Sequence, residues 1–147
     1  MKKEVLISIA GIHYGVSGET ETEESDPIEV ITPASYYLKN GKHYIVYDEV
    51  VEGVPGTVKN KVKITGDTLF EIHRSGLTNT HMIFEKDKIY MTNYETPFGK
   101  MLVGVHTRDM RMEITEDDIR VEIFYSLDVN HEPLSECEIR VHVRSVG

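Results

Sequence analysis

The chain has 147 residues, a single cysteine and a formal net charge of −9. A chain of this length can bury enough surface to fold as one domain, 1–147, without a metal or a disulfide, and one cysteine excludes an internal disulfide. The acidic balance argues against a nucleic-acid partner, because phosphate binding relies on clustered Lys and Arg. Five acidic residues lie between Glu19 and Asp26, and removing them leaves −4 for the rest of the chain.

The N-terminus carries a short apolar stretch, Val5 to Ala10, that could be mistaken for the core of an export signal. Its six residues fall short of the usual ~7–15, and no cleavage site of small residues follows. We therefore interpret the stretch as part of a first strand and expect a cytoplasmic protein. No apolar run approaches the ~20 residues of a membrane helix, so no membrane span is expected.

Strand signals continue along nearly the whole chain, and nowhere do apolar residues recur with helical spacing. Asn-Gly at 40–41 is a strong hairpin signal, and short polar turns at 66–67, 86–87 and 116–118 predict further reversals. The segment 15–26 is the only long loop expected. The predicted strands are 3–14, 28–39, 43–51, 57–65, 68–74, 80–85, 88–95, 101–113, 119–129 and 134–146.

The C-terminal part of the chain carries the clearest pattern. Every odd position from Ile119 to Val129 is apolar, and the alternation resumes from Cys137 to Val143. Eleven extended residues span roughly 37 Å, about twice the usual strand length, which favours a bent sheet that wraps around a core. Sequential hairpins without crossover helices predict an antiparallel meander. Closure removes exposed edges, so we predict an all-β barrel of about 8–10 strands rather than a sandwich.

Three groups of residues stand out by their order and spacing. They are the strand 44–49, Arg74-Ser75-Gly76 followed by 82–85, and 94–99 leading to Thr107 with 125–127 downstream. Together they resemble the YwiB-like proteins, a bacterial family of unknown function. The resemblance covers roughly residues 27–145 and implies a calycin-like, lipocalin-type barrel with an internal cavity. It implies no substrate and no catalytic residues, because none is known for the family.

Strand phase identifies polar residues that face the predicted interior. Glu49 and Arg74 each share a face with apolar neighbours, and a buried charge must be paired. We hypothesise that Arg74, with Tyr47 and Tyr125, holds an anionic head group, as an internal Arg and Tyr do in lipocalin-like and fatty-acid-binding barrels. Glu49 is then the counter-ion of Arg74 in the empty site. The alternative is that both charged residues lie at the barrel rim, solvated or in a plain salt bridge.

The segment Thr96-Pro97-Phe98-Gly99 interrupts a strand. Proline cannot donate a ladder hydrogen bond and glycine permits a positive φ, so the segment predicts a barrel corner. A functional alternative is a loop at the barrel mouth, with Phe98 as a lid over the bound molecule.

Other chemistry has little support. No His-x-His pair occurs, and His73 and His81, which could meet across a turn, lack a clear third ligand, so no metal and no cofactor are expected. Cys137 lies in phase with Ile139 and is interpreted as a core residue. The chain has no phosphate-binding glycine loop and no nucleophile elbow. The acidic run 19–26 is interpreted as a solvated hairpin end, the alternative being contact with cations or a basic partner.

Two functions remain open. The first is a non-catalytic barrel that binds a small amphipathic or anionic molecule in its interior, with Arg74, Glu49, Tyr47, Tyr125 and Phe98 as candidate ligand-binding residues. The second is a filled barrel that acts through its surface as a regulatory or protein–protein interaction module, since aliphatic side chains can fill a small barrel. An enzyme has no positive support from any residue.

Overall fold

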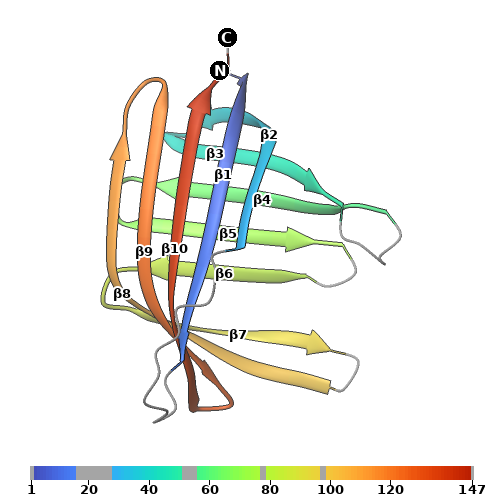
Figure 1. Ribbon diagram of the computed structural model, residues 1–147, viewed down its shortest axis with the longest axis vertical. Helices are drawn as coiled ribbons and strands as arrows, with labels where there is room; N and C mark the ends of the chain where they lie inside the picture. Colours follow the sequence, from blue (N-terminus) through green and yellow to red (C-terminus); the bar gives the residue numbers. More distant parts are fainter. Residues whose placement is uncertain (1, 16–27, 51–55, 77–78, 97–98, 147) are drawn as a thin grey trace.

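The computed structural model describes residues 2–15, 28–50, 56–76, 79–96 and 99–146. Within these ranges it contains ten β-strands and no helix, so no described segment forms a helix able to cross a bilayer. The strands shown in Figure 1 are β1 (Lys2–Gly15), β2 (Ile28–Lys39), β3 (Lys42–Glu49), β4 (Val58–Thr65), β5 (Leu69–Ser75), β6 (Thr80–Glu85), β7 (Ile89–Thr96), β8 (Gly99–Ile114), β9 (Asp118–Val129) and β10 (Glu132–Ser145).

All ten strands belong to one antiparallel sheet in the order β6-β5-β4-β3-β2-β1-β10-β9-β8-β7. The first and last strands pair with each other over eleven residues, so the two ends of the chain close the meander. The two edges of the sheet, β6 and β7, are consecutive in the chain and therefore start from the same turn. The predicted all-β antiparallel barrel is confirmed, with one seam between β6 and β7.

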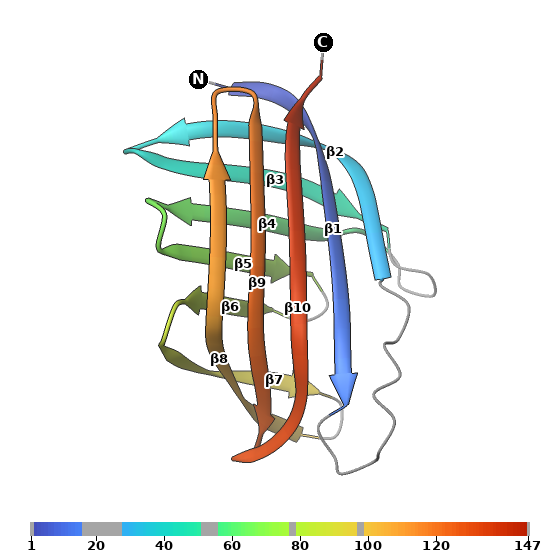
Figure 2. The same cartoon turned by 60° about the vertical axis from the view of Figure 1, so that its left-hand side comes forward.

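The sheet folds over on itself in two halves. Strands β8, β9, β10 and β1 follow the long axis of the molecule, and β3 to β7 cross behind them in both views (Figures 1 and 2). Strand β2 bends sharply and so belongs to both halves (Figure 2). Such near-perpendicular packing brings the inner faces of the two halves together over a shared core.

The barrel closes at a bulge in β8. The main-chain N–H of Asp87 donates to the carbonyl of Thr107 at 2.9 Å, and the N–H of Thr107 donates to Lys88 at 3.2 Å. The register shifts between Thr107 and Asp109, which adds a residue to β8. The bulge inverts the alternation, so Val105 faces inward before it and Met110 after it. A continuous strand was expected over 101–113, and the sequence alone did not indicate this inversion.

The predicted core alternation is confirmed. In β9 and β10, Ile123 is 0% and Val141 2% exposed, and Cys137 is buried in the same cluster. The ring of Phe84, from β6, packs edge-on against Tyr125, from β9, with centroids 5.0 Å apart. Phe70 lies beside Phe84, also without exposure. Aromatic side chains from opposite halves therefore meet in the middle of the barrel and fill it there.

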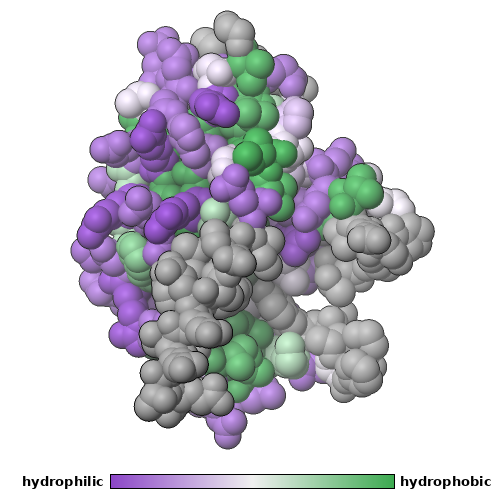
Figure 3. Space-filling view, in the orientation of Figure 1, coloured by the Kyte–Doolittle hydropathy of each residue, from purple (hydrophilic) through white to green (hydrophobic). Residues whose placement is uncertain are grey.

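The outer face of the long-axis strands is charged. Arg111, Glu122 and Arg140 lie in one cross-strand row, and in the next row Glu113 faces Arg120, which faces His142. In Figure 3 the side of the molecule formed by β8 and β9 is mainly hydrophilic. Opposite charges that face each other across neighbouring strands stabilise the sheet. The charged residues of this surface therefore have a structural explanation.

Candidate functional site

One cross-strand row on the inner face of the sheet is polar. Tyr47 of β3, Asn60 of β4, Arg74 of β5 and Thr80 of β6 are register partners and therefore share a face. The row lies at the side of the sheet where β3 and β5 end and β4 and β6 begin (Figure 1). The next row toward the core is apolar and consists of Ile45, Val62, Ile72 and Met82.

Three side chains at this end of β3, β4 and β5 are joined by hydrogen bonds. Arg74 Nη2 donates to Glu49 Oε1 at 2.7 Å, and Arg74 Nε donates to Asn60 Oδ1 at 3.1 Å. The Asn60 amide nitrogen donates to the same Glu49 oxygen at 3.3 Å. Asn60 is only 2% exposed, so its amide fixes both charged groups from a buried position. We call Tyr47, Glu49, Asn60 and Arg74 the mouth cluster.

Arg74 and Glu49 are therefore paired, but at the rim of the barrel. Their side chains are 44% and 27% exposed, so neither charge lies in a dry interior. This arrangement matches the rim salt bridge that the strand phase left open as the alternative. It also makes the ion pair a modest contributor to stability, because solvent screens exposed pairs.

Part of the mouth cluster's hydrogen-bonding capacity is unused. A guanidinium has five N–H donors, and the edge formed by Nε and Nη2 already contacts Asn60 and Glu49. Among the described residues, Nη1 has no hydrogen-bond partner, and neither does the Tyr47 hydroxyl. Burial raises the pKa of Tyr47 to about 12, with Glu49 adding to the shift and Arg74 opposing it. The phenol consequently stays protonated and can donate a hydrogen bond at neutral pH.

The remaining predicted site residues are placed differently. Tyr125 packs against Phe84 in the core, and its register partners are Thr107 and Cys137. Phe98 lies outside the described residues, so a lid there remains a prediction. Asn60 was not predicted as a site residue, although an amide between inward-facing Val58 and Val62 is the signal that could have identified it.

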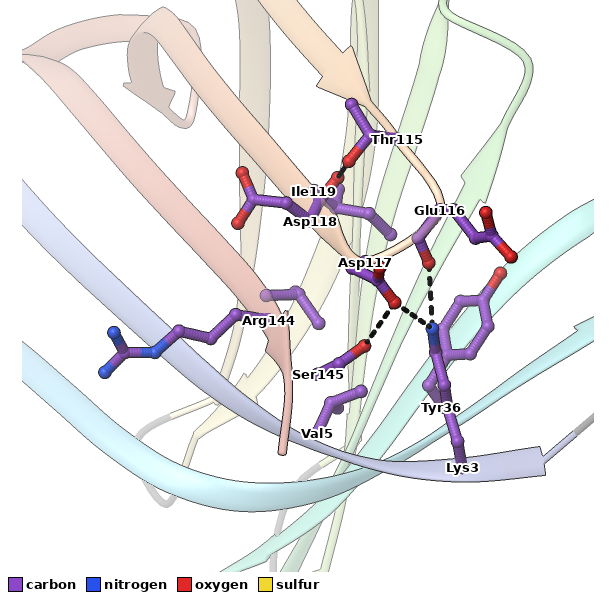
Figure 4. Close-up of a pocket in the computed structure, with 11 residues that line it drawn as sticks. Lys3, Val5, Tyr36, Thr115, Glu116, Asp117, Asp118, Ile119, Arg144 and Ser145 are labelled. Atoms are coloured by element: carbon purple, nitrogen blue, oxygen red, sulfur yellow. Dashed lines mark hydrogen bonds and ion pairs between the residues drawn. The ribbon is translucent and has the colours of Figure 1, made fainter. Parts of the chain in front are cut away.

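A second polar group lies beside the chain termini and is shown in Figure 4. Lys3 Nζ donates to the Glu116 carbonyl at 2.8 Å, lies 3.8 Å from Asp117 Oδ1, and sits 5.4 Å from the centre of the Tyr36 ring. Ser145 Oγ donates to the same Asp117 oxygen at 3.2 Å. We call these residues the terminal plug. They leave a free volume of about 10 Å³, room for one water molecule and no more.

The two histidines that could meet across a turn do lie side by side. His73 and His81 are register partners on the outer face of β5 and β6, with ring centroids 5.3 Å apart. In the described part of the chain, no group of three or more His, Cys, Asp or Glu side chains is arranged to hold a metal ion.

Residues 14–141 match the family model described as a domain of unknown function, DUF1934. The chain belongs to this family. The "Uncharacterized beta-barrel protein YwiB" of Bacillus subtilis (strain 168) is 30% identical to it over 106 residues, which are 71% of this chain and 72% of that protein. The resemblance to YwiB-like proteins that the motifs suggested is thus confirmed.

The fold of the DUF1934 chain also resembles a solved structure. The crystal structure of the ywiB protein from Bacillus subtilis superposes with a TM-score of 0.78 at 20% identity, covering 99% of this chain and 94% of that one. At this identity the likeness establishes the barrel fold alone. The family is of unknown function, so it assigns no chemistry to the residues of this chain.

Proposed function

We propose that this protein is a non-catalytic binding barrel that takes a small anionic molecule at the mouth cluster. The observation that carries the proposal is the state of Arg74: Asn60 and Glu49 fix one edge of its guanidinium, whereas Nη1 has no partner among the described residues. A carboxylate or a phosphate group can accept two N–H bonds from the edge of the guanidinium that Nη1 and Nη2 form. The protonated Tyr47 hydroxyl supplies a further donor beside it.

The surroundings of the mouth cluster favour an amphipathic ligand. Directly inside the polar row lie the partly buried Ile72 and Met82, beside the fully buried Ile45 and Val62. An apolar tail can lie against Ile72 and Met82 while the anionic head contacts Arg74. Because aromatic side chains occupy the middle of the barrel, the tail has to be short.

Ligand-induced thermal stabilisation tests this function. Short-chain anionic amphiphiles, octanoate and octyl phosphate, are expected to raise the melting temperature, whereas neutral octyl glucoside is not. Arg74→Met is expected to abolish the shift, and Glu49→Gln to enlarge it, because removing the neighbouring negative charge strengthens the attraction of Arg74 for an anion. If no anionic amphiphile shifts the melting temperature of the wild-type protein, the proposal is wrong.

A second candidate function is a filled barrel that acts through its surface as a regulatory or interaction module. The packing of Phe84 on Tyr125 across the two halves favours it, because it removes space from the middle of the barrel. Native mass spectrometry of protein purified from its source discriminates the two functions. A co-purified small molecule lost in Arg74→Met supports the mouth cluster, whereas a protein partner retained by that variant supports the surface.

A further inference from the structure

The outer face of β3 to β6 carries a hollow that the mouth cluster does not use. It has a volume of about 180 Å³. It lies on the opposite face of the strands from Arg74, because its residues have the opposite phase. We call it the basic hollow. Its lining residues are Tyr44, Lys61, Lys63, Glu71, His73 and His81.

Cationic side chains concentrate on this face although the chain is acidic overall. Lys59, Lys61 and Lys63 alternate along β4 and share its outer face, roughly 7 Å apart along the strand. Lys61 is the register partner of His73, which is the partner of His81, so three basic side chains form one cross-strand row. Like charges directly opposite each other destabilise a sheet.

Acidic side chains neutralise only part of this row. Glu71 lies next to this row on the same face, and its side chain is 14% exposed. Its Oε1 lies 3.0 Å from His81 Nε2, and its Oε2 lies 3.9 Å from Lys63 Nζ. Lys61 and His73 have no acidic partner among the described residues. An anion that enters the hollow would therefore meet cationic side chains whose charge Glu71 does not balance.

Aromatic side chains hold the ammonium groups in place. Tyr44 stacks on Tyr37 with ring centroids 4.9 Å apart and planes inclined by 8°. Lys61 Nζ and Lys63 Nζ lie 5.8 and 5.9 Å from the centre of the Tyr44 ring. Cation–π contacts at this distance restrict two otherwise mobile lysines and direct both toward the same wall of the hollow.

We propose that the basic hollow binds a tetrahedral dianion of the phosphate or sulfate type, either free or as the ester of a small molecule. Lys61 and Lys63 donate from one side, and His73 donates from the other. Glu71 stays bonded to His81 and orients its ring. A volume of about 180 Å³ admits the dianion with a small organic group.

A titration with sulfate at neutral pH, followed by NMR, tests the proposal, because sulfate is a tetrahedral dianion at that pH. We expect saturable shifts of the backbone amides around Lys61, His73 and His81. The charged groups that face the two histidines are Lys61 and Lys63 on β4 and Glu71 on β5. Sodium chloride at equal ionic strength is the salt control.

Two variants sharpen the test. Lys61→Gln is expected to weaken sulfate binding about tenfold, the loss of one charge-assisted hydrogen bond. The control Lys100→Gln, at an exposed lysine of β8, leaves the affinity unchanged. At pH 8, tighter binding of phenyl phosphate than of inorganic phosphate assigns the site to an ester, and equal binding assigns it to the free anion.

Two outcomes overturn the proposal. One is the absence of saturable shifts at the basic hollow in wild-type protein up to about 50 mM sulfate, well beyond a millimolar dissociation constant. The other is an equal affinity of wild type and Lys61→Gln. Shifts confined to residues around Arg74 report on the mouth cluster and also contradict binding at the hollow, so the two sites are tested separately.

Discussion

The mouth cluster and the terminal plug use similar side chains to different effect. Each places one long cationic side chain beside a tyrosine and a carboxylate. In the plug, Lys3 is engaged by a carbonyl, a carboxylate and a ring face, and the remaining volume is about 10 Å³. In the mouth cluster, Asn60 and Glu49 fix Arg74 through one edge and leave the other edge unbonded. Residue type alone therefore does not identify a site; what matters is how much bonding capacity remains.

The mouth cluster and the terminal plug are separate regions if side chains fill the barrel between them. A substitution of Phe84 tests this packing and is expected to have the largest effect on stability. Phe84 is fully buried and contacts both Phe70 and Tyr125. Phe84→Ala is expected to lower the free energy of unfolding by about 3–5 kcal/mol, because the variant loses apolar burial and leaves a cavity. Urea denaturation measures the change. A loss below about 1 kcal/mol would show that the middle of the barrel is loosely packed.

The second largest effect on stability is expected for the buried amide of Asn60 in the mouth cluster. Asn60→Ala is expected to destabilise the protein by about 1–3 kcal/mol, since Arg74 Nε and Glu49 Oε1 each lose a partner. The variant is also expected to lose the thermal shift with octanoate, because Arg74 is no longer held in one orientation. Asn93→Ala, at an exposed position of β7, serves as the matched control, expected within about ±0.5 kcal/mol of wild type. Equal stability of the two variants would mean that Asn60 does not fix the ion pair.

Much of the barrel follows from local pattern. In β9 and β10 an unbroken period of two, joined by a short polar turn, determines which side chains face inward, as the burial of Ile123 and Val141 shows. The long strands and the hairpin at 40–41 were also predictable, because turn residues and alternation act over a few residues.

Features that depend on distant partners were not predictable. The bulge after Thr107 exists where the turn 86–88 docks on β8, and neither segment alone indicates that contact. Likewise the ion pair of Arg74 could be anticipated from phase, but phase left open whether the pair lies at the rim or in the interior. Whether a residue lies at the rim or in the interior depends on where each strand ends against its neighbours. Asn60 gains its importance only from the register that aligns β3, β4 and β5.

A substitution in the terminal plug is expected to cost less stability than one in the mouth cluster. Lys3→Met keeps the length of the side chain and removes its charge, so the contacts with the Glu116 carbonyl and Asp117 are lost. The expected cost is below about 1 kcal/mol, because the ammonium is partly exposed and its partners can turn to water. Chemical denaturation at low and high salt measures it. A cost above that of Asn60→Ala would reverse the ranking of the two regions.

The smallest effect is expected for the pH dependence of stability at Tyr36, the aromatic residue of the terminal plug. Tyr36 lies 2.6 Å from His43 Nδ1, and its hydroxyl donates when that nitrogen is unprotonated. Burial lowers the pKa of His43, so the unfolded chain takes up the proton first as the pH falls. Stability is therefore unaffected above the unfolded pKa of about 6.5 and declines as the pH falls from there through the lower folded value. His43→Gln removes this proton uptake. Melting temperatures of the two proteins between pH 8 and pH 5 should consequently diverge only below about pH 6.5, and parallel curves would show that the imidazole titrates alike in both states.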